Sequence, residues 1–175
     1  MKLSAKEVKD MVNAGMVLPD DLTVDGNLNL SHSSIRFLPN NLAINGCLDL
    51  SNSEISYIGN NLYVKGYLDL SSSKISSISD DTKVEGDLYL GNTGISSIPD
   101  SLKTGGDVDL SNTKLESLPD NMVVNGFLNL ESTPIKSLPN NLVVRGNLFL
   151  KDTQIGMIPA DSIVTGYIDI RKTRI

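Results

Sequence analysis

The chain of 175 residues contains one cysteine, one histidine and no tryptophan. The single cysteine, Cys47, excludes an intrachain disulfide framework and fits a reducing compartment. Together with the lone His32 it supplies too few ligands for a zinc site of the usual cysteine and histidine kind within one chain. We therefore expect neither a metal site nor a cofactor.

Long apolar runs and an excess of positive charge are also missing. No run approaches the ~20 apolar residues that a membrane-spanning helix needs, and the N-terminal segment MKLSAKEVKD is too polar for a classical signal peptide. The 15 Lys and Arg residues are outnumbered by 21 Asp and Glu residues, for a formal net charge of −6, which disfavours direct binding of nucleic acid. These features predict a cytoplasmic location, in the producing or in a host cell, away from membranes.

What the sequence does contain is an internal repeat of 20 residues. Seven full copies and a last one of 18 residues run from Leu18 to Ile175. Glycine occupies the same column in all eight copies, from Gly26 to Gly166. We expect this glycine to be required because a neighbouring coil crowds its position or because φ is positive there.

The spacing within a copy predicts one main strand per coil. Val24, Leu28 and Leu30 alternate with other residues, which is the period-two pattern of a strand with one buried face. Six apolar columns give 48 positions in the eight copies, and the polar exceptions are Thr82, Thr104 and Ser162. Such units bury their apolar faces by stacking, so the sequence predicts a parallel β-solenoid.

A column of serine or threonine, from Ser33 to Thr173, follows each strand. Hydroxyl groups at a bend can satisfy backbone groups that the turn leaves unpaired. Nucleophilic catalysis needs a base, and no histidine or lysine recurs beside these hydroxyls with the same period. We therefore predict that the hydroxyl column is structural.

The only segment outside the repeats, residues 1–17, predicts a capping helix. Ser4 and Glu7 have the spacing of a capping box, and Gly15 suits the position just after a helix. The exposed apolar end of a solenoid must be covered. We thus expect an N-terminal helical cap over 1–17 and eight repeats over 18–175, with a helix offered to a partner as the alternative use of the cap.

The run Leu48-x-Leu50-x-x-Ser53-x-Ile55-x-x-Ile58 follows the leucine-rich-repeat pattern, and the period resembles the short bacterial leucine-rich repeats of secreted pathogen effectors. The resemblance spans residues 18–175, but serine or threonine replaces the usual asparagine, and a Val-x-Gly segment replaces a leucine. It implies a leucine-rich-repeat-like solenoid that binds proteins with its strand face. The departures leave open a flatter β-solenoid with a second short strand at residues 22–24.

Function is expected where the repeat lets residues vary. The outward strand positions, the first and third after each column glycine, form 16 sites that hold six of the 21 acidic residues, five of the eight aromatic residues and no Lys or Arg. Aromatic side chains flanked by carboxylates are typical of interface anchors, whereas the plainer interpretation is a solvated face with high β-propensity. The predicted partner-binding residues are Asp49, Tyr67, Asp69, Asp87, Tyr89, Asp107, Asp109, Phe127, Phe149, Tyr167 and Asp169.

These features predict a non-catalytic protein–protein interaction module. We expect a stand-alone inhibitor or adaptor, bacterial or phage-encoded as the resemblance implies, whose partner has a basic or mixed basic and apolar surface. The alternative is a nucleic-acid mimic that occupies the basic groove of a DNA- or RNA-handling enzyme. An enzyme is not expected, because Asp107 and Asp109 would lie on an open strand without a water-excluding site.

The C-terminal edge bears on the oligomeric state. The last copy would leave an unpaired strand at residues 168–170, and two such edges can pair about a two-fold axis. The basic residues Arg171, Lys172 and Arg174 would then bring like charges together. We expect a monomer, or a weak dimer through this edge.

Overall fold

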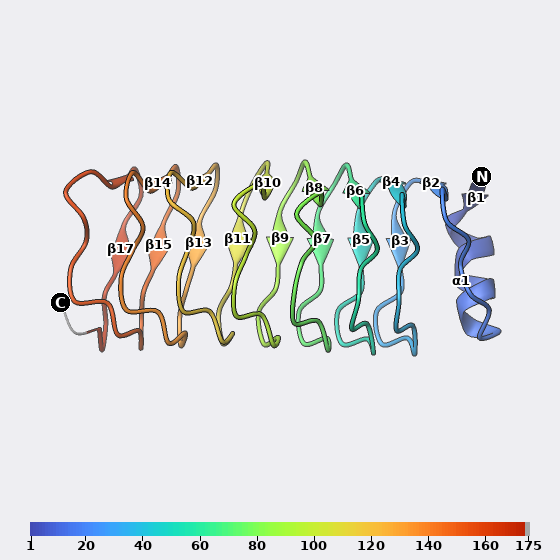
Figure 1. Ribbon diagram of the computed structural model, residues 1–175, viewed down its shortest axis with the longest axis horizontal. Helices are drawn as coiled ribbons and strands as arrows, with labels where there is room; N and C mark the ends of the chain where they lie inside the picture. Colours follow the sequence, from blue (N-terminus) through green and yellow to red (C-terminus); the bar gives the residue numbers. More distant parts are fainter. Residues whose placement is uncertain (174–175) are drawn as a thin grey trace.

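Each 20-residue copy forms one coil, and the coils stack along one axis in the computed structural model, which describes residues 1–173 (Figure 1). The predicted parallel β-solenoid with an N-terminal helix is confirmed. The axis is nearly straight in this view, with the helix at one end and the last coil at the other (Figure 1). Arg174 and Ile175, which belong to the predicted C-terminal edge and the last apolar column, lie outside the described residues.

Each coil carries two short strands instead of one main strand. The first strands of the successive coils are β2 (Thr23–Asp25), β4 (Ala43–Asn45), β6 (Tyr63–Val64), β8 (Lys83–Val84), β10 (Lys103–Thr104), β12 (Val123–Val124), β14 (Val143–Val144) and β16 (Ile163–Val164). The second strands are β3 (Leu28–Asn29), β5 (Leu48–Asp49), β7 (Leu68–Asp69), β9 (Leu88–Tyr89), β11 (Val108–Asp109), β13 (Leu128–Asn129), β15 (Leu148–Phe149) and β17 (Ile168–Asp169). This arrangement matches the flatter alternative derived from the sequence, in which an additional short strand is expected at residues 22–24; that strand is β2, which begins one residue later, at Thr23.

The strands pair in parallel and in strict register of the repeat, as Leu28 with Leu48 shows. The second strands form one eight-stranded sheet from β3 to β17. The first strands form two sheets, one running from β1 (Lys2–Ser4) through β2 to β10 and the other containing β12, β14 and β16. The wall of the solenoid that the first strands form is therefore interrupted between β10 and β12, whereas the wall that the second strands form is continuous.

The core is a stack of identical apolar columns. Leu48, Leu50 and Ile55 of the second coil have no exposed surface, and their equivalents in most other coils are equally buried. The column glycines lie at the corner before each second strand, where the coils touch. A Cβ on Gly86 would lie 2.7 Å from the carbonyl carbon of Gly66, so the predicted crowding by a neighbouring coil is confirmed there; at Gly26 the requirement is instead a positive φ of 85°.

The hydroxyl column caps backbone carbonyl groups inside the bend. Thr113 Oγ1 donates a hydrogen bond of 2.7 Å to the carbonyl oxygen of Leu110, and Thr133 repeats this bond to Leu130. Two serines depart from this pattern: the buried hydroxyl oxygen of Ser33 has no hydrogen-bond partner within residues 1–173, and Ser73 Oγ accepts from the Ile75 backbone N–H at 3.5 Å. The predicted structural role of this column is confirmed.

The turn before each first strand comes in two forms that differ in the φ of one residue. Asn41, Asn61, Asn121 and Asn141 adopt positive φ in this turn, and Asp21 does the same. Asparagine tolerates this left-handed conformation better than most residues. Where the column holds Asp81, Ser101 or Asp161 the φ is not positive, and the turn closes on itself with a bond such as Leu102 N–H to the Pro99 carbonyl, 3.1 Å.

The helix α1 (Ala5–Asn13) covers the first coil and has both predicted end signals. The Ser4 hydroxyl accepts from the Glu7 backbone N–H while the Glu7 carboxylate accepts from the Ser4 backbone N–H, which completes the capping box. At the other end Gly15 has a φ of 69°, and Met16 N–H donates to the Met11 carbonyl, as in a Schellman motif. Within the described residues, no helix has the length and apolar character needed to span a membrane.

Candidate interaction surface

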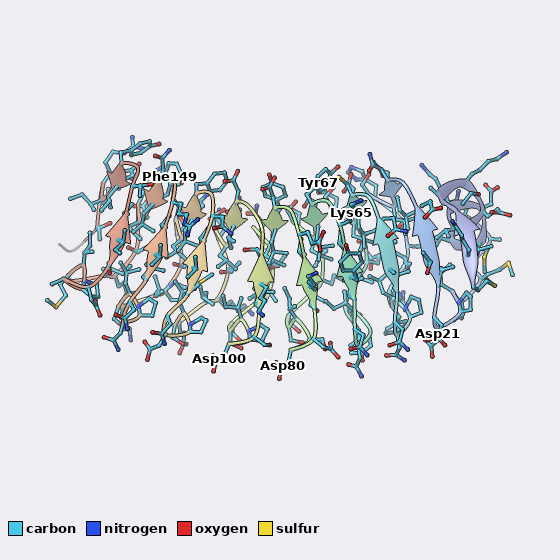
Figure 2. All side chains as sticks on the ribbon, turned by 90° about the horizontal axis from the view of Figure 1, so that it is seen from above. Asp21, Lys65, Tyr67, Asp80, Asp100 and Phe149 are labelled. Atoms are coloured by element: carbon cyan, nitrogen blue, oxygen red, sulfur yellow. The ribbon has the colours of Figure 1, made fainter. Side chains whose placement is uncertain are left out.

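The outward side chains of the eight-stranded sheet form a single surface, here called the strand face. It consists of two columns: the first column is the residue after each column glycine, from Asn27 to Tyr167, and the second column is the residue two positions further on, from Asn29 to Asp169. Because the sheet is continuous and in register, it brings all eleven predicted partner-binding residues onto this face. Two of the aromatic residues, Tyr67 and Phe149, lie along one long side of the solenoid, opposite the turn residues Asp80 and Asp100 (Figure 2).

The five aromatic side chains form two clusters. Tyr67 and Tyr89 stack edge to face with ring centroids 6.3 Å apart. Phe127, Phe149 and Tyr167 form a chain of edge-to-face pairs, with centroids 5.9 and 5.4 Å apart. This packing leaves Tyr89, Phe127 and Phe149 half-buried, whereas Tyr67 and Tyr167 remain exposed. The clusters are preformed.

The acidic residues of the second column hold the bend that follows the strand. Asp49 Oδ1 accepts from the backbone N–H of Ser51 at 3.0 Å and from its hydroxyl at 2.7 Å. Asp69 and Asp109 accept from the corresponding backbone N–H groups at 2.9 Å. Asparagine makes the same bond in this column at Asn29 and Asn129, so the bend requires a side-chain oxygen and no charge.

The acidic residues of the first column link one coil to the next. Asp87 Oδ1 accepts from the backbone N–H of Asp107, and Asp107 Oδ1 accepts from that of Phe127, both at 2.8 Å. Asn27 and Asn147 bond to the next coil in the same way. Sequence reasoning missed these structural roles, because a strand pattern shows which side chains point outward but not which backbone groups they reach.

Carboxylate oxygens nevertheless remain available in the middle of the strand face. For Asp69, Asp107 and Asp109, one oxygen serves the backbone and no donor within residues 1–173 reaches the other. Asp87 Oδ2 accepts from the Tyr89 hydroxyl at 3.1 Å. Burial, this hydrogen bond and the negative charges of Asp87, Asp107 and Asp69 raise the pKa of Tyr89 to about 12. Three carboxylates thus lie close enough to Tyr89 to disfavour its ionisation.

The C-terminal end of the strand face is neutralised. Arg171 donates to Asp169, with Nη2 to Oδ2 at 2.6 Å, and this hydrogen-bonded ion pair lowers the pKa of Asp169 to about 2. Lys151 and Lys172 both lie near Asp152, at 4.0 and 3.8 Å. The basic residues at this end therefore already have acidic neighbours within the chain. The charge of the strand face accordingly changes from acidic in coils 2–5 to nearly neutral at coil 8.

Comparison with models of known protein families gave no match, and comparisons with curated proteins and with solved structures gave none either.

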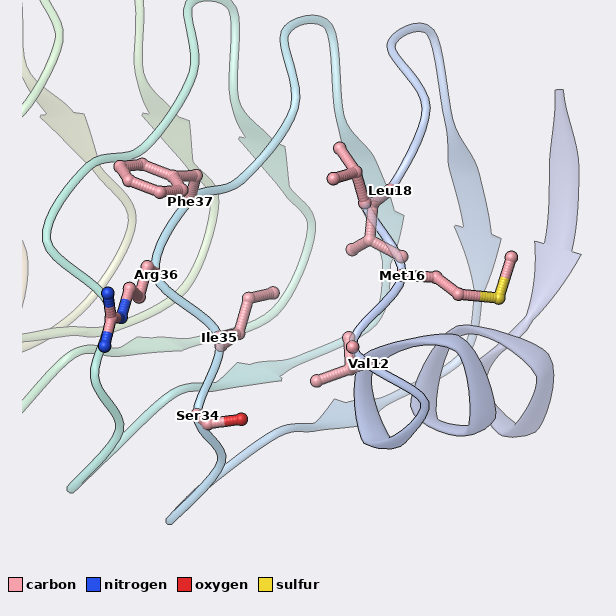
Figure 3. Close-up of a pocket in the computed structure, with 9 residues that line it drawn as sticks. Val12, Met16, Leu18, Ser34, Ile35, Arg36 and Phe37 are labelled. Carbon is pink, nitrogen blue, oxygen red and sulfur yellow. The ribbon is translucent and has the colours of Figure 1, made fainter.

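Besides a hollow of about 240 Å³ lined by Glu116, Pro134, Lys136 and Gln154, two hollows lie away from the strand face, and none of them was predicted. One of about 210 Å³ separates the end of α1 from the first coil; Val12, Met16, Leu18, Ile35 and Phe37 are among its lining residues (Figure 3). It forms because the short helix leaves Ile35 half-buried, whereas Ile55 and its equivalents are fully covered. The sequence contained one signal for this hollow: Phe37 is an aromatic residue in a column that is otherwise mostly polar.

The second hollow, of about 400 Å³, opens between the turns of coils 5 and 6, where the wall of first strands is interrupted. Here the turn of Ser101 meets the left-handed turn of Asn121. Gly105 N–H donates to the Gly86 carbonyl at 3.1 Å, a bond that the column glycine itself makes in other coils, as Gly126 does to Gly106. β10 pairs with β8 at Lys103 and Thr104, and the described residues contain no pairing of β10 with β12.

Side chains that could bind a metal ion or act as nucleophiles or bases are the remaining candidates for a functional site. Within residues 1–173, no three His, Cys, Asp or Glu side chains are grouped so that they could hold a metal ion. Cys47 is a half-buried free thiol in the first column, and His32 is an exposed residue of the bend with a φ of 57°. The predictions that the chain has no cofactor and is not an enzyme remain predictions.

Proposed function

We propose that this chain is a non-catalytic protein-binding module that contacts its partner through the strand face. The observation that carries the proposal is the pair of preformed aromatic clusters on one rigid sheet, with free carboxylate oxygens between them. Aromatic side chains that are already held in place lose little conformational entropy on binding, which is why they act as interface anchors.

The partner that fits this surface is a protein with a basic or mixed basic and apolar face. The two columns contain no Lys or Arg, and Arg171 reaches only the last coil. The resemblance of the repeat to short bacterial leucine-rich repeats supports the more specific proposal of an inhibitor or adaptor, from a bacterium or its phage, that acts in the cytoplasm of the producing or host cell. The basic residues already paired near the last coil support a monomer.

Affinity capture with two matched triple variants tests the proposal. Tyr89→Ala with Phe127→Ala and Phe149→Ala removes three aromatic side chains from the strand face. Phe37→Ala with Tyr57→Ala and Tyr63→Ala removes the three aromatic side chains outside it. A partner captured by the wild type is identified by mass spectrometry, purified and titrated against all three proteins.

We expect the strand-face variant to lose affinity by tenfold or more, while the control variant binds like the wild type. Equal affinity of both variants for the partner would show that the strand-face aromatic side chains do not bind it, which contradicts the proposal. Capture of a nucleic-acid-handling enzyme that duplex DNA or RNA displaces would instead favour the alternative, a nucleic-acid mimic. Regular carboxylates on successive strands support that alternative, but their density is below the one charge per ~1.7 Å of duplex DNA.

A further inference from the structure

The strand face is polarised along the solenoid axis. Coils 3–5 carry the free carboxylate oxygens of Asp69, Asp107 and Asp109 beside the Tyr67 and Tyr89 rings. Coils 6–8 carry the apolar cluster of Phe127, Phe149 and Tyr167, and the acid at that end is paired with Arg171. Two different chemical environments thus lie side by side on one sheet.

We infer that the strand face binds an extended protein segment that crosses the strands and carries a basic side chain and, four residues away, a large apolar side chain. This inference rests on the proposed function and adds the chemistry and spacing of the segment. The basic group lies against Tyr67 and Tyr89 among the carboxylates, and the apolar group packs on Phe127 and Phe149.

Charge and ring chemistry select the basic group at the first position. An aromatic ring attracts a guanidinium or ammonium group over its face, and the nearby carboxylates supply opposite charge. Both effects act at Tyr89, because its hydroxyl group donates to Asp87 Oδ2 at 3.1 Å and the neighbouring coils carry Asp69 and Asp107 on the strand face. At the second position the edge-to-face rings offer an apolar surface. The strand face of coils 6 to 8 contains one acidic residue, Asp169, and Arg171 forms an ion pair with it.

The geometry of the sheet gives the spacing. Neighbouring strands lie about 4.8 Å apart, so Tyr89 on β9 and Phe149 on β15, three strands away, are separated by about 14 Å along the axis. An extended segment rises about 3.3 Å per residue, and its residues at positions one and five project from the same side about 13 Å apart. A four-residue separation therefore places both side chains on the strand face together.

The test uses the full chain labelled with ¹⁵N and the blocked heptapeptide Gly-Arg-Gly-Ser-Gly-Phe-Gly as the probe. Control peptides carry glutamine in place of arginine, alanine in place of phenylalanine, or arginine and phenylalanine as neighbours. We expect millimolar peptide to shift the backbone resonances of β7, β9, β11, β13 and β15, and each control peptide to bind more weakly. Shifts confined to other parts of the chain, or no shifts, would overturn the inference.

A matched pair of charge variants makes the test local. Asp69→Asn with Asp107→Asn keeps the backbone hydrogen bonds, since Asn29 and Asn147 make them in the same columns, and removes two charges. Asp80→Asn with Asp120→Asn removes two charges from exposed turns, where the column also holds asparagine. The first variant should bind the arginine peptide with an affinity roughly three- to tenfold lower than that of the wild type, and the second should bind it with unchanged affinity.

Equal weakening by both charge variants would mean that net charge alone attracts the peptide, which contradicts the inference. The two proposals can fail separately. If a protein partner is lost with the strand-face aromatic side chains but no peptide binds, the module function stands and the extended-segment inference is wrong. If the aromatic variant retains its partner, the proposed function is wrong as well.

Discussion

Replacement of Gly86 by alanine should destabilise the solenoid because a methyl group has no room between coils 3 and 4. A Cβ at this position would lie 2.7 Å from the carbonyl carbon and oxygen of Gly66 and 2.9 Å from the amide nitrogen of Tyr67. Ordinary contacts between such atoms are about 3.5–4.0 Å. All three neighbours are backbone atoms, so a coil must shift in the variant. This shift would strain the 3.1 Å hydrogen bond from Gly86 N–H to the Gly66 carbonyl.

The expected cost is that of overpacking, about 1–3 kcal/mol in the free energy of unfolding. For a chain of this length each kcal/mol changes the melting temperature by about 2–4 °C, so the Tm should fall by roughly 2–12 °C. Urea unfolding followed by circular dichroism measures the change, with the slope of the transition checked for constancy.

Two other glycines separate crowding from backbone conformation. A Cβ at Gly156 would meet nothing within 4 Å and φ is ordinary, so Gly156→Ala should stabilise the chain by about 0.4–1 kcal/mol. Gly26 also faces open space but has a φ of 85°, so Gly26→Ala should cost about 1–2 kcal/mol from conformation alone. If Gly86→Ala unfolds at the same urea concentration as Gly156→Ala, the glycine column is not a steric requirement.

Three further predictions address other parts of the fold. Thr113→Val leaves the buried Leu110 carbonyl unpaired and should cost about 1 kcal/mol in thermal unfolding, whereas Ser33→Ala, which removes an unbonded hydroxyl, should cost less; the reverse order would contradict the role assigned to the column. Asp81→Asn with Ser101→Asn should favour the left-handed turn and raise the Tm, and a lower Tm would show that asparagine does not select this turn. The pKa of Tyr89, about 12, lies above the ordinary value of about 10, so the folded state favours the neutral phenol and the unfolding free energy should fall as pH rises from about 10 through about 12. Urea unfolding at about pH 9 and about pH 11 should show a smaller loss in Tyr89→Phe, and equal losses would mean that Tyr89 is not responsible.

The architecture could be predicted because each column repeats the same chemistry. Apolar residues at nearly every inward position leave parallel stacking in register as the arrangement that buries them together. The ends of α1 could be predicted for a different reason: Ser4, Glu7 and Gly15 act locally, through bonds to their own turns, so no knowledge of the rest of the fold was needed.

The details that escaped prediction depend on contacts between coils. The short first strands are defined by pairing with the next coil, and three-residue or two-residue segments carry little propensity of their own. The interruption of the wall of first strands lies where coil 5 departs from the other coils at Ser101, Thr104 and Gly105, and none of these departures breaks the period. The half-burial of Phe127 and Phe149 arises because they belong to different columns of neighbouring coils and meet diagonally.

The interruption between β10 and β12 has a consequence for the cooperativity of the array. Within residues 1–173, every other pair of neighbouring coils shares two strand pairings, whereas coils 5 and 6 share one, that of β11 with β13. In a linear array the weakest junction is where partial opening begins. The amide protons of β12, β14 and β16 should therefore exchange with solvent sooner than those of β4 and β6, through a form in which coils 1–5 are intact and coils 6–8 are open.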